Sequence, residues 1–363
     1  MEKQTRYGKI YSELLESILN GQLKIGDKLP TEQELTERYG VSRITSKKAL
    51  EMLAHENYVT RVSGRGTFVI SNGVQKSRCS GNIIGVIISG FSSGFGSNFI
   101  QGVQDRCAAH NGIVAISCPY ATQEEETKEI ARFLENGIKG LIIMPVHGVN
   151  YNPGILANVL DGFPLVLADR YLSGLSVPFV GTKNFSSAAT AVNYLFAHGH
   201  KNIAFVSSLV RTTALRERLD GYIDAYAQSK FPLNKALIKS ELYYTIPGMH
   251  VDEVMAEDVG SLIRFFEENL NVTAVLAADF PVALLVNSAL EKMGKKVPDD
   301  ISMICYDRMD DSPMNFTYIR QSQYEMGGAA VDLLYKVISR DDIADSHVLL
   351  DYELVEGDTV RSV

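Results

Sequence analysis

The spacing of apolar residues near the start of the chain predicts two helices joined by a turn. Between residues 7 and 21, apolar side chains recur about every 3.6 residues, which is typical of an amphipathic helix ending at Gly21. Thr31 stands three residues before Glu34, which is the spacing of a capping box. A second helix is therefore expected to begin at Thr31 and to stop at Gly40.

A third helix and a hairpin are expected to follow. Ser42 suits an N-cap, and the helix after it should present an apolar face made of Ile44, Ala49, Leu50 and Leu53. Residues 58–62 and 66–70 have the composition of two strands on either side of the turn "SGRG". Two helices joined by a short glycine-containing turn and followed by a hairpin predict a winged helix-turn-helix.

The pattern changes at residue 83. Short apolar runs that indicate strands alternate from there with amphipathic stretches of helical length. This alternation predicts a doubly wound parallel sheet, and about 280 residues favour two lobes over one. The fold class expected is α/β, with a winged helix-turn-helix over 1–71, a polar linker over 72–82 and a two-lobed domain over 83–363. Ligands of such sheets bind beyond the carboxyl ends of the strands.

Charge is divided unevenly between these parts. The chain of 363 residues has a formal net charge of -8, yet residues 1–71 hold 11 Lys and Arg against 9 Asp and Glu. The acidity therefore belongs to the larger part, and the smaller part can approach a polyanion. Arg43, Lys47 and Lys48 cluster at the start of the third helix. Charge alone favours a solvated helix face there, whereas the helix-turn-helix spacing and the wing favour DNA contact.

Other patterns exclude several classes of protein. The polar start lacks a secretory signal and no apolar run approaches the roughly 18 residues of a membrane span, so we expect a cytoplasmic protein without membrane contact. No G-x-G-x-x-G opens the first βα turn and no nucleophile elbow appears, so we expect neither an enzyme nor a cofactor. The histidines of "FAHGH", His198 and His200, suit a helix C-terminus better than a metal site. We expect reduced, structural thiols at Cys79, Cys107, Cys118 and Cys305.

Residues 5–70 resemble the winged helix-turn-helix of GntR-family bacterial transcription regulators. The resemblance is carried by "LPTEQELTERYGVSRITSKKALEML" and "VSGRGTFV". It implies that the third helix faces double-stranded DNA, where arginine can pair with guanine and lysine can hold phosphate. Gln33 departs from the arginine that the family often has. The positions implied for DNA contact are Thr31, Glu32, Ser42, Arg43, Thr45, Lys47, Lys48, Arg65 and Gly66, with Gly66 bringing the wing close to the minor groove.

Residues 83–356 resemble the effector-binding domain of LacI-family repressors, which is similar to periplasmic sugar-binding proteins. The resemblance is carried by "VLADR", "VGTKNFSSAATAVNYLFAHGHKNIAFV" and "ALEKMGKKVPDDISMICYDRMDD". Asp279 and Phe280 depart from the family's Asn-Asp pair. The positions implied for effector contact are Phe95, Asp169, Arg218, Asp279, Asp307 and Gln321, a set with carboxylates and a guanidinium for sugar hydroxyls and an aromatic face for the C–H surface.

Each of these assignments has a competing structural role. Arg218 lies in "RERLD", where a surface helix charge could make ordinary ion pairs. Asp307 could be a buried helix cap, and Phe95 could be part of the core. Asp169 is followed by Arg170, and the two could form a structural ion pair.

The combined layout is similar to that of arabinose-responsive repressors of Gram-positive bacteria. It implies a repressor that binds a pseudo-palindromic operator as a homodimer and leaves it when a small carbohydrate, L-arabinose first, is bound. Two alternatives remain open, since the effector could be another metabolite such as a purine and the protein could be an activator. A transport protein is disfavoured by the helix-turn-helix and the missing secretory signal, and an enzyme by the missing catalytic motifs.

Overall fold

The computed structural model describes residues 6–363 with gaps. Outside the description are 57, 63–65, 71–80, 89–94, 119–121, 147–151, 210–211, 247–248, 250, 310–311, 313 and 342–345. Most of the linker expected over 72–82, including Cys79, lies outside the described residues, and so does Arg65. The chain forms two compact units, residues 1–81 and residues 82–363. We call them the head and the body, and each is described by itself.

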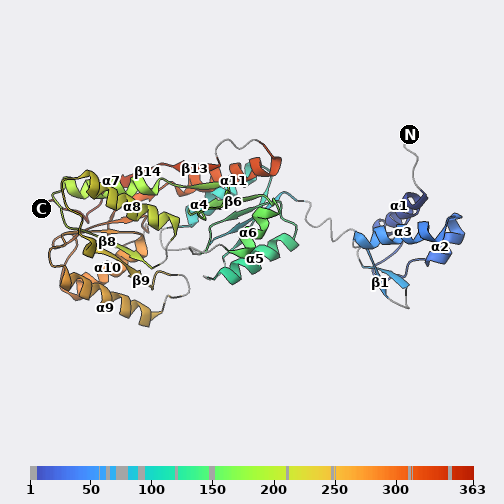
Figure 1. Ribbon diagram of the computed structural model, residues 1–363, viewed down its shortest axis with the longest axis horizontal. Helices are drawn as coiled ribbons and strands as arrows, with labels where there is room; N and C mark the ends of the chain where they lie inside the picture. Colours follow the sequence, from blue (N-terminus) through green and yellow to red (C-terminus); the bar gives the residue numbers. More distant parts are fainter. Residues whose placement is uncertain are drawn as a thin grey trace. The chain divides into compact units, whose positions relative to one another are not determined.

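The head consists of three helices and a two-stranded antiparallel hairpin (Figure 1). Its elements are α1 (Arg6–Leu19), α2 (Glu32–Tyr39), α3 (Arg43–His55), β1 (Val59–Val62) and β2 (Gly66–Val69). The capping box expected at Thr31 is present, since the Thr31 side chain accepts from the Glu34 amide and the Glu34 carboxylate accepts from the Thr31 amide. Gly40 ends α2 with a left-handed backbone, φ 61°, which glycine adopts without steric cost.

The apolar face of α3 differs from the expected one at a single residue. Ala49, Leu50 and Leu53 are buried as expected, but Ile44 is 80% exposed and Ser46 is fully buried. The cap explains the difference. Ser42 accepts from the Thr45 amide and so fixes where the helix begins, and the inward positions then follow helical spacing back from Leu53 and Leu50 to Ser46. The expectation that Ile44 points into the core is wrong.

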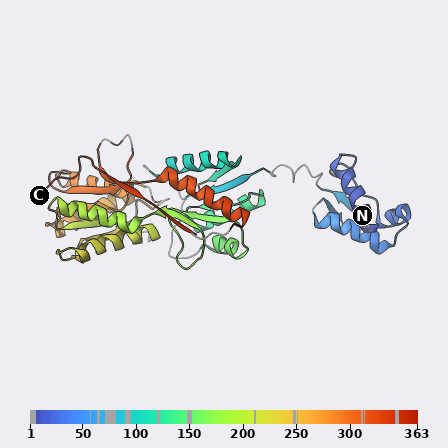
Figure 2. The same ribbon diagram turned by 90° about the horizontal axis from the view of Figure 1, so that it is seen from above.

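The body contains two six-stranded sheets, each covered by helices on both faces. The first lobe has an all-parallel sheet in the order β13-β7-β6-β5-β3-β4. Helices α4 and α11 pack on one face and α5 and α6 on the other (Figure 2). The strands are β3 (Ile83–Ile87), β4 (Ile113–Ser117), β5 (Leu141–Ile143), β6 (Leu165–Ala168), β7 (Phe179–Thr182) and β13 (His347–Leu350), and the helices are α4 (Ser97–Ala109), α5 (Gln123–Glu135), α6 (Pro153–Leu160) and α11 (Gln323–Ser339).

The second lobe has the strand order β14-β12-β11-β10-β8-β9. All neighbours are parallel except β12 and β14. Helices α7 and α8 cover one face, and α9 and α10 cover the other (Figure 1). The strands are β8 (Ile203–Ser208), β9 (Ile238–Leu242), β10 (Ala274–Ala277), β11 (Ser302–Tyr306), β12 (Thr317–Gln321) and β14 (Tyr352–Val355), and the helices are α7 (Asn184–Ala197), α8 (Thr213–Gln228), α9 (Asp252–Glu268) and α10 (Phe280–Lys292). The expected doubly wound, two-lobed fold is confirmed.

The chain crosses between the lobes after β7, after β12 and after β13. One residue stands at each crossing, namely Lys183, Ser322 and Asp351. The Lys183 Nζ lies 2.6 Å from the Asp351 carboxylate, and the Ser322 hydroxyl donates to the Asp351 carbonyl at 2.9 Å. These bonds connect the three crossing segments, so a movement of one lobe relative to the other must involve all three segments.

Candidate functional site

The exposed face of α3 carries the cationic side chains assigned to DNA. Arg43, Lys47 and Lys48 are all exposed, and the Arg43 side chain is 81% accessible. Lys47 pairs with Glu51 one turn later, at 3.6 Å, and the Lys48 ammonium lies 4.3 Å from the centre of the Tyr7 ring. These exposed partners hold the lysines weakly, which leaves both able to exchange them for phosphate oxygens.

The remaining assigned side chains of this region are occupied within the head. The Thr31 and Ser42 hydroxyls serve as helix caps, and the Thr45 hydroxyl lies 2.9 Å from that of Ser42. Glu32 accepts from Arg43 Nε at 3.3 Å and from Arg61 Nη2 at 3.0 Å. A carboxylate has only acceptors, so Glu32 orients these two arginines, one on α3 and one on β1, rather than holding phosphate.

At the wing, the structure describes Gly66 but not Arg65. Gly66 begins β2 with φ 121°, a backbone that other residues rarely adopt. A Cβ atom there would also stand 2.5 Å from the Lys28 side chain. Sequence reasoning missed Arg61, which lies on β1 and bonds to Glu32 together with Arg43.

The residues assigned to the effector lie where strands end. Asp169 follows β6, Asp279 follows β10, Asp307 follows β11, and Gln321 is the last residue of β12. Arg218 reaches the same region from α8. In a doubly wound fold this is the edge at which ligands bind, because the loops after parallel strands converge there.

Arg218 is the centre of a buried network. The residue is 5% exposed, and its guanidinium donates to Asn184 Oδ1 at 2.8 Å, to the Ala278 carbonyl at 2.6 Å and to Gln321 Oε1 at 3.1 Å. It also lies over the Tyr306 ring, 3.7 Å from its centre. The reading of Arg218 as a surface helix charge is therefore wrong, since the side chain points inward and all three bonds go to neutral oxygens.

Gln321 extends this network to Asp307 and to the first lobe. Its side-chain amide donates to Asp307 Oδ2 at 2.6 Å, and its carbonyl accepts from Thr182 at 3.0 Å as well as from Arg218. The Gln321 backbone amide donates to Asp307 Oδ1 at 3.1 Å. Asp307 is buried with φ 52° and accepts from a strand, so the helix-cap reading does not apply to it.

Burial sets the protonation of this carboxyl group. It raises the pKa of Asp307 to about 6, against the opposing effects of the Gln321 hydrogen bonds and the Arg218 charge. Burial also raises the pKa of Asp279, and the hydrogen bond from the Val282 amide opposes that shift. Asp279 is the N-cap of α10, so one of its oxygens already has a structural role.

The two residues assigned in the first lobe are placed differently. Asp169 is buried with φ 64° and accepts from Arg170 Nε at 2.9 Å, so the ion pair weighed as an alternative is present. Phe95 is partly buried against the core beneath α4 and α11. The next residue, Gly96, donates its amide to Gln323 Oε1 at 3.1 Å, two residues after Gln321. The structure thus joins Arg218 to Asp307 through Gln321 and leaves Phe95 and Asp169 with local partners.

Sequence reasoning missed Asn184 and Tyr306, which contact Arg218 directly. The Tyr306 hydroxyl lies 2.8 Å from that of Ser187, and burial raises the pKa of Tyr306 to about 12, so the ring stays neutral beneath the guanidinium. Both residues carried a usable signal, since Tyr306 ends an apolar strand and Asn184 follows one.

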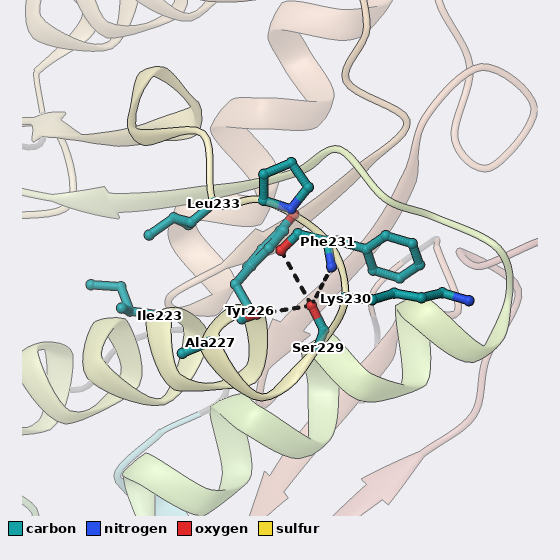
Figure 3. Close-up of a pocket in the computed structure, with 8 residues that line it drawn as sticks. Ile223, Tyr226, Ala227, Ser229, Lys230, Phe231 and Leu233 are labelled. Atoms are coloured by element: carbon teal, nitrogen blue, oxygen red, sulfur yellow. Dashed lines mark hydrogen bonds between the residues drawn. The ribbon is translucent and has the colours of Figure 1, made fainter.

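A separate depression of about 390 Å³ lies beyond the C-terminal end of α8 (Figure 3). Its apolar lining comes from Ile223, Tyr226, Phe231 and Leu233, and Ser229 holds the turn by donating to the Tyr226 carbonyl and accepting from the Phe231 amide. It contains none of the residues assigned to the effector, and it is distinct from the Arg218 network.

The described residues contain no cluster of three or more His, Cys, Asp or Glu placed to hold a metal ion. His198 ends α7, and His200 is buried between Thr273 and the Arg361 carbonyl. Cys107 and Cys305 are buried free thiols, whereas Cys118 is partly exposed. Within the described part of the chain, no helix has the length and apolar content needed to span a membrane.

Comparisons with known proteins agree with both halves of the architecture. Residues 6–69 match the bacterial regulatory proteins of the gntR family, and residues 192–360 match the periplasmic binding protein-like domain. An arabinose metabolism transcriptional repressor from Geobacillus stearothermophilus is 26% identical over 99% of this chain and 98% of its own.

Two solved structures show the same fold. A transcriptional regulator CelR–cellobiose complex has a TM-score of 0.68 and 18% identity, covering 99% of this chain and 100% of its own. A LacI family transcriptional regulator from Enterococcus faecium with bound ribose has a TM-score of 0.63 and 21% identity, covering 77% and 99%. The curated relatives are transcriptional regulators rather than enzymes. The chain therefore joins a helix-turn-helix domain that matches the gntR family of bacterial regulatory proteins to a periplasmic-binding-protein-like domain of the LacI type, and it is similar over its full length to transcriptional repressors.

Proposed function

We propose that this regulator is a homodimeric repressor that binds operator DNA in the bacterial cytoplasm and releases it when a small carbohydrate binds the body. The observation that carries the proposal is the network of Arg218, Gln321 and Asp307. It gathers a guanidinium, an amide and a carboxyl at the ends of β11 and β12, next to a crossing between the lobes.

The chemistry of this network suits a polyol. Sugar hydroxyls donate and accept at once, so they need fixed acceptors and fixed donors at close spacing. Asp307 and Asp279 supply acceptors, and Arg218 supplies donors in a planar fork. Tyr306 holds the guanidinium from one side, which reduces the entropy that binding would otherwise cost.

The relatives support a carbohydrate and favour a pentose. The Geobacillus protein is an arabinose metabolism repressor, and the two solved structures hold ribose and cellobiose. L-arabinose is therefore the first effector we propose. A non-sugar metabolite such as a purine would use the same donors and acceptors but would also need an aromatic stacking surface, which makes it the second candidate.

The DNA-binding half of the proposal rests on α3. Its exposed cationic side chains suit the major groove, and a dimer would place two copies of α3 on two half-sites of a pseudo-palindrome. Gln321 links the proposed effector site to the arrangement of the lobes, because it contacts Thr182 in the first lobe and Asp307 in the second. A ligand that binds one arrangement of the lobes more tightly shifts the population toward that arrangement.

Calorimetric titration of the full-length protein tests the effector site. Arg218→Lys keeps the charge and loses the fork, so L-arabinose should bind at least about tenfold more weakly than to the wild type, because bonds to a charged group are lost. Arg216→Ala changes an exposed arginine of the same helix and should leave the affinity unchanged.

Two results would count against this assignment. Equal sugar affinity in the wild type and Arg218→Lys would remove Arg218 from the site. Binding of adenine or hypoxanthine with none for L-arabinose, D-ribose or cellobiose would replace the carbohydrate with a purine. An activator would differ from a repressor in that its target's transcription would fall when the gene for the regulator is deleted.

A further inference from the structure

Ile44 occupies an unusual position for a large apolar side chain. At 80% exposed it is more accessible than any other large hydrophobic residue of the described part of the chain. It is the second residue of α3, directly after Arg43. Exposed isoleucines are common one at a time, so exposure alone assigns nothing. What matters is which face of the helix carries it.

Ile44 lies on the cationic face of α3. Residues three and four positions apart share a helix face, so Ile44 lies with Lys47 and Lys48. The opposite positions, Ser46 and Leu50, are buried. Replacing a residue that packs into the core lowers stability, but Ile44 makes no core contacts that a replacement would remove. Isoleucine is also a poorer helix former than alanine or leucine, so helix propensity does not account for it either.

We propose that Ile44 reads the C5-methyl group of a thymine in the major groove and so determines part of the operator sequence. This inference rests on the proposed DNA-binding function. In the major groove, thymine alone among the four bases presents a methyl group, and an aliphatic side chain is its natural partner. Lys47 and Lys48 carry the charge for phosphate contacts on the same face, which would hold the helix in register while Ile44 meets a base edge.

Replacing thymine by uracil tests this directly, because uracil keeps the pairing and removes only the methyl group. The full-length protein first selects its preferred duplex from a random pool. Each thymine of one half-site is then replaced singly, and affinity is measured for the wild type, Ile44→Ala and Ile44→Val. Ile25→Ala is the matched control, since Ile25 is a 53% exposed isoleucine of the head outside α3.

One thymine per half-site should show the effect. Its replacement should weaken wild-type binding about fourfold, the equivalent of burying one methyl group (~0.8 kcal/mol). Ile44→Ala should bind the original duplex about fourfold more weakly and lose its response to that replacement, since both changes remove the same contact. Ile44→Val and Ile25→Ala should respond as the wild type does.

The remaining outcomes separate the inference from the function on which it rests. The protein could bind DNA sequence-selectively while every uracil replacement has the same effect on the wild type and on Ile44→Ala. This result would overturn the inference alone, and Ile44 would then be assigned to another partner such as a protein. Failure to select any duplex would overturn the proposed function, and the inference with it.

Discussion

At the residue scale, the candidate effector site depends on one arginine and the groups that surround it. Arg218 donates to three oxygens that come from α7, the end of β10 and the end of β12. A buried guanidinium is stable only when its donors are bonded, so these three contacts fix its direction. Asp307 lies one hydrogen bond further along, through Gln321, and its raised pKa is the electrostatic consequence of this burial.

Asp307 should make the free energy of unfolding depend on pH. Its folded pKa of about 6 lies above the ordinary value of 3.8, so the folded protein holds this proton more tightly than the unfolded chain. The contribution of the protonated Asp307 carboxyl to folding stability is fully present below pH 3.8 and is lost as the pH rises through 6. Relative to the wild type, Asp307→Asn should therefore gain stability between about pH 4 and pH 7, by at most ~3 kcal/mol.

Urea unfolding of the wild type and Asp307→Asn across this pH range measures the difference. Asp299→Asn, at an exposed aspartate of the same lobe, is the matched control. A difference for Asp307→Asn that stays constant with pH would show that this carboxyl titrates normally.

Sequence reasoning succeeded at residues whose role is local. The caps at Thr31 and Ser42 depend on side chains within three residues and were predictable. Ile44 was misplaced because an apolar residue at the start of a helix fits a stripe until the cap fixes the helical phase. Asn184 and Tyr306 were missed because their contact with Arg218 joins elements far apart in the sequence.

At the element scale, α3 is a helix whose beginning matters more than its length. Its first turn carries Arg43 and Ile44, and the Ser42 side chain caps it by accepting from the Thr45 amide at 3.3 Å. The bounds expected in the head agree with those observed, since α2 lies between the Thr31 cap and Gly40 and α3 begins directly after Ser42.

Removing the cap should loosen the start of α3 without changing the rest of the head. Ser42→Ala should lower the free energy of unfolding of the head by about 1 kcal/mol and weaken DNA binding, because residues proposed to contact DNA lie in the turn that frays. Ser42→Asn should restore both properties, since asparagine caps as well as serine. Urea unfolding of the full chain and binding to its selected duplex provide the two measurements. A Ser42→Ala variant with unchanged stability and affinity would exclude this role for the cap.

At the scale of the whole molecule, hydrogen bonds join the two lobes of the body. Apart from the three crossings, Tyr171 of the first lobe bonds to α8 of the second. Its backbone amide donates to the Thr213 hydroxyl at 3.0 Å, and its side-chain hydroxyl donates to Glu217 Oε1 at 3.1 Å. These contacts exist only when the lobes are near one another, so they are among those that a ligand between the lobes would favour.

The alternation of strands and helices was sufficient to predict two doubly wound lobes, but not the path of the chain between them. Helix α11 follows a strand of the second lobe and packs on α4 of the first, and β14 joins its sheet antiparallel. Neither follows from local pattern, because both depend on pairings between segments far apart in the sequence.

The central claim is that a carbohydrate bound in the body controls the affinity of the head for DNA. Fluorescence anisotropy of the full-length protein on its selected duplex measures that affinity while L-arabinose, other sugars and purines are added in turn. We expect one sugar to weaken DNA binding at least about tenfold at saturation, a coupling of ~1.4 kcal/mol, and we expect Arg218→Lys to require more of that sugar for the same effect. Unchanged affinity with every sugar of the panel would contradict the claim.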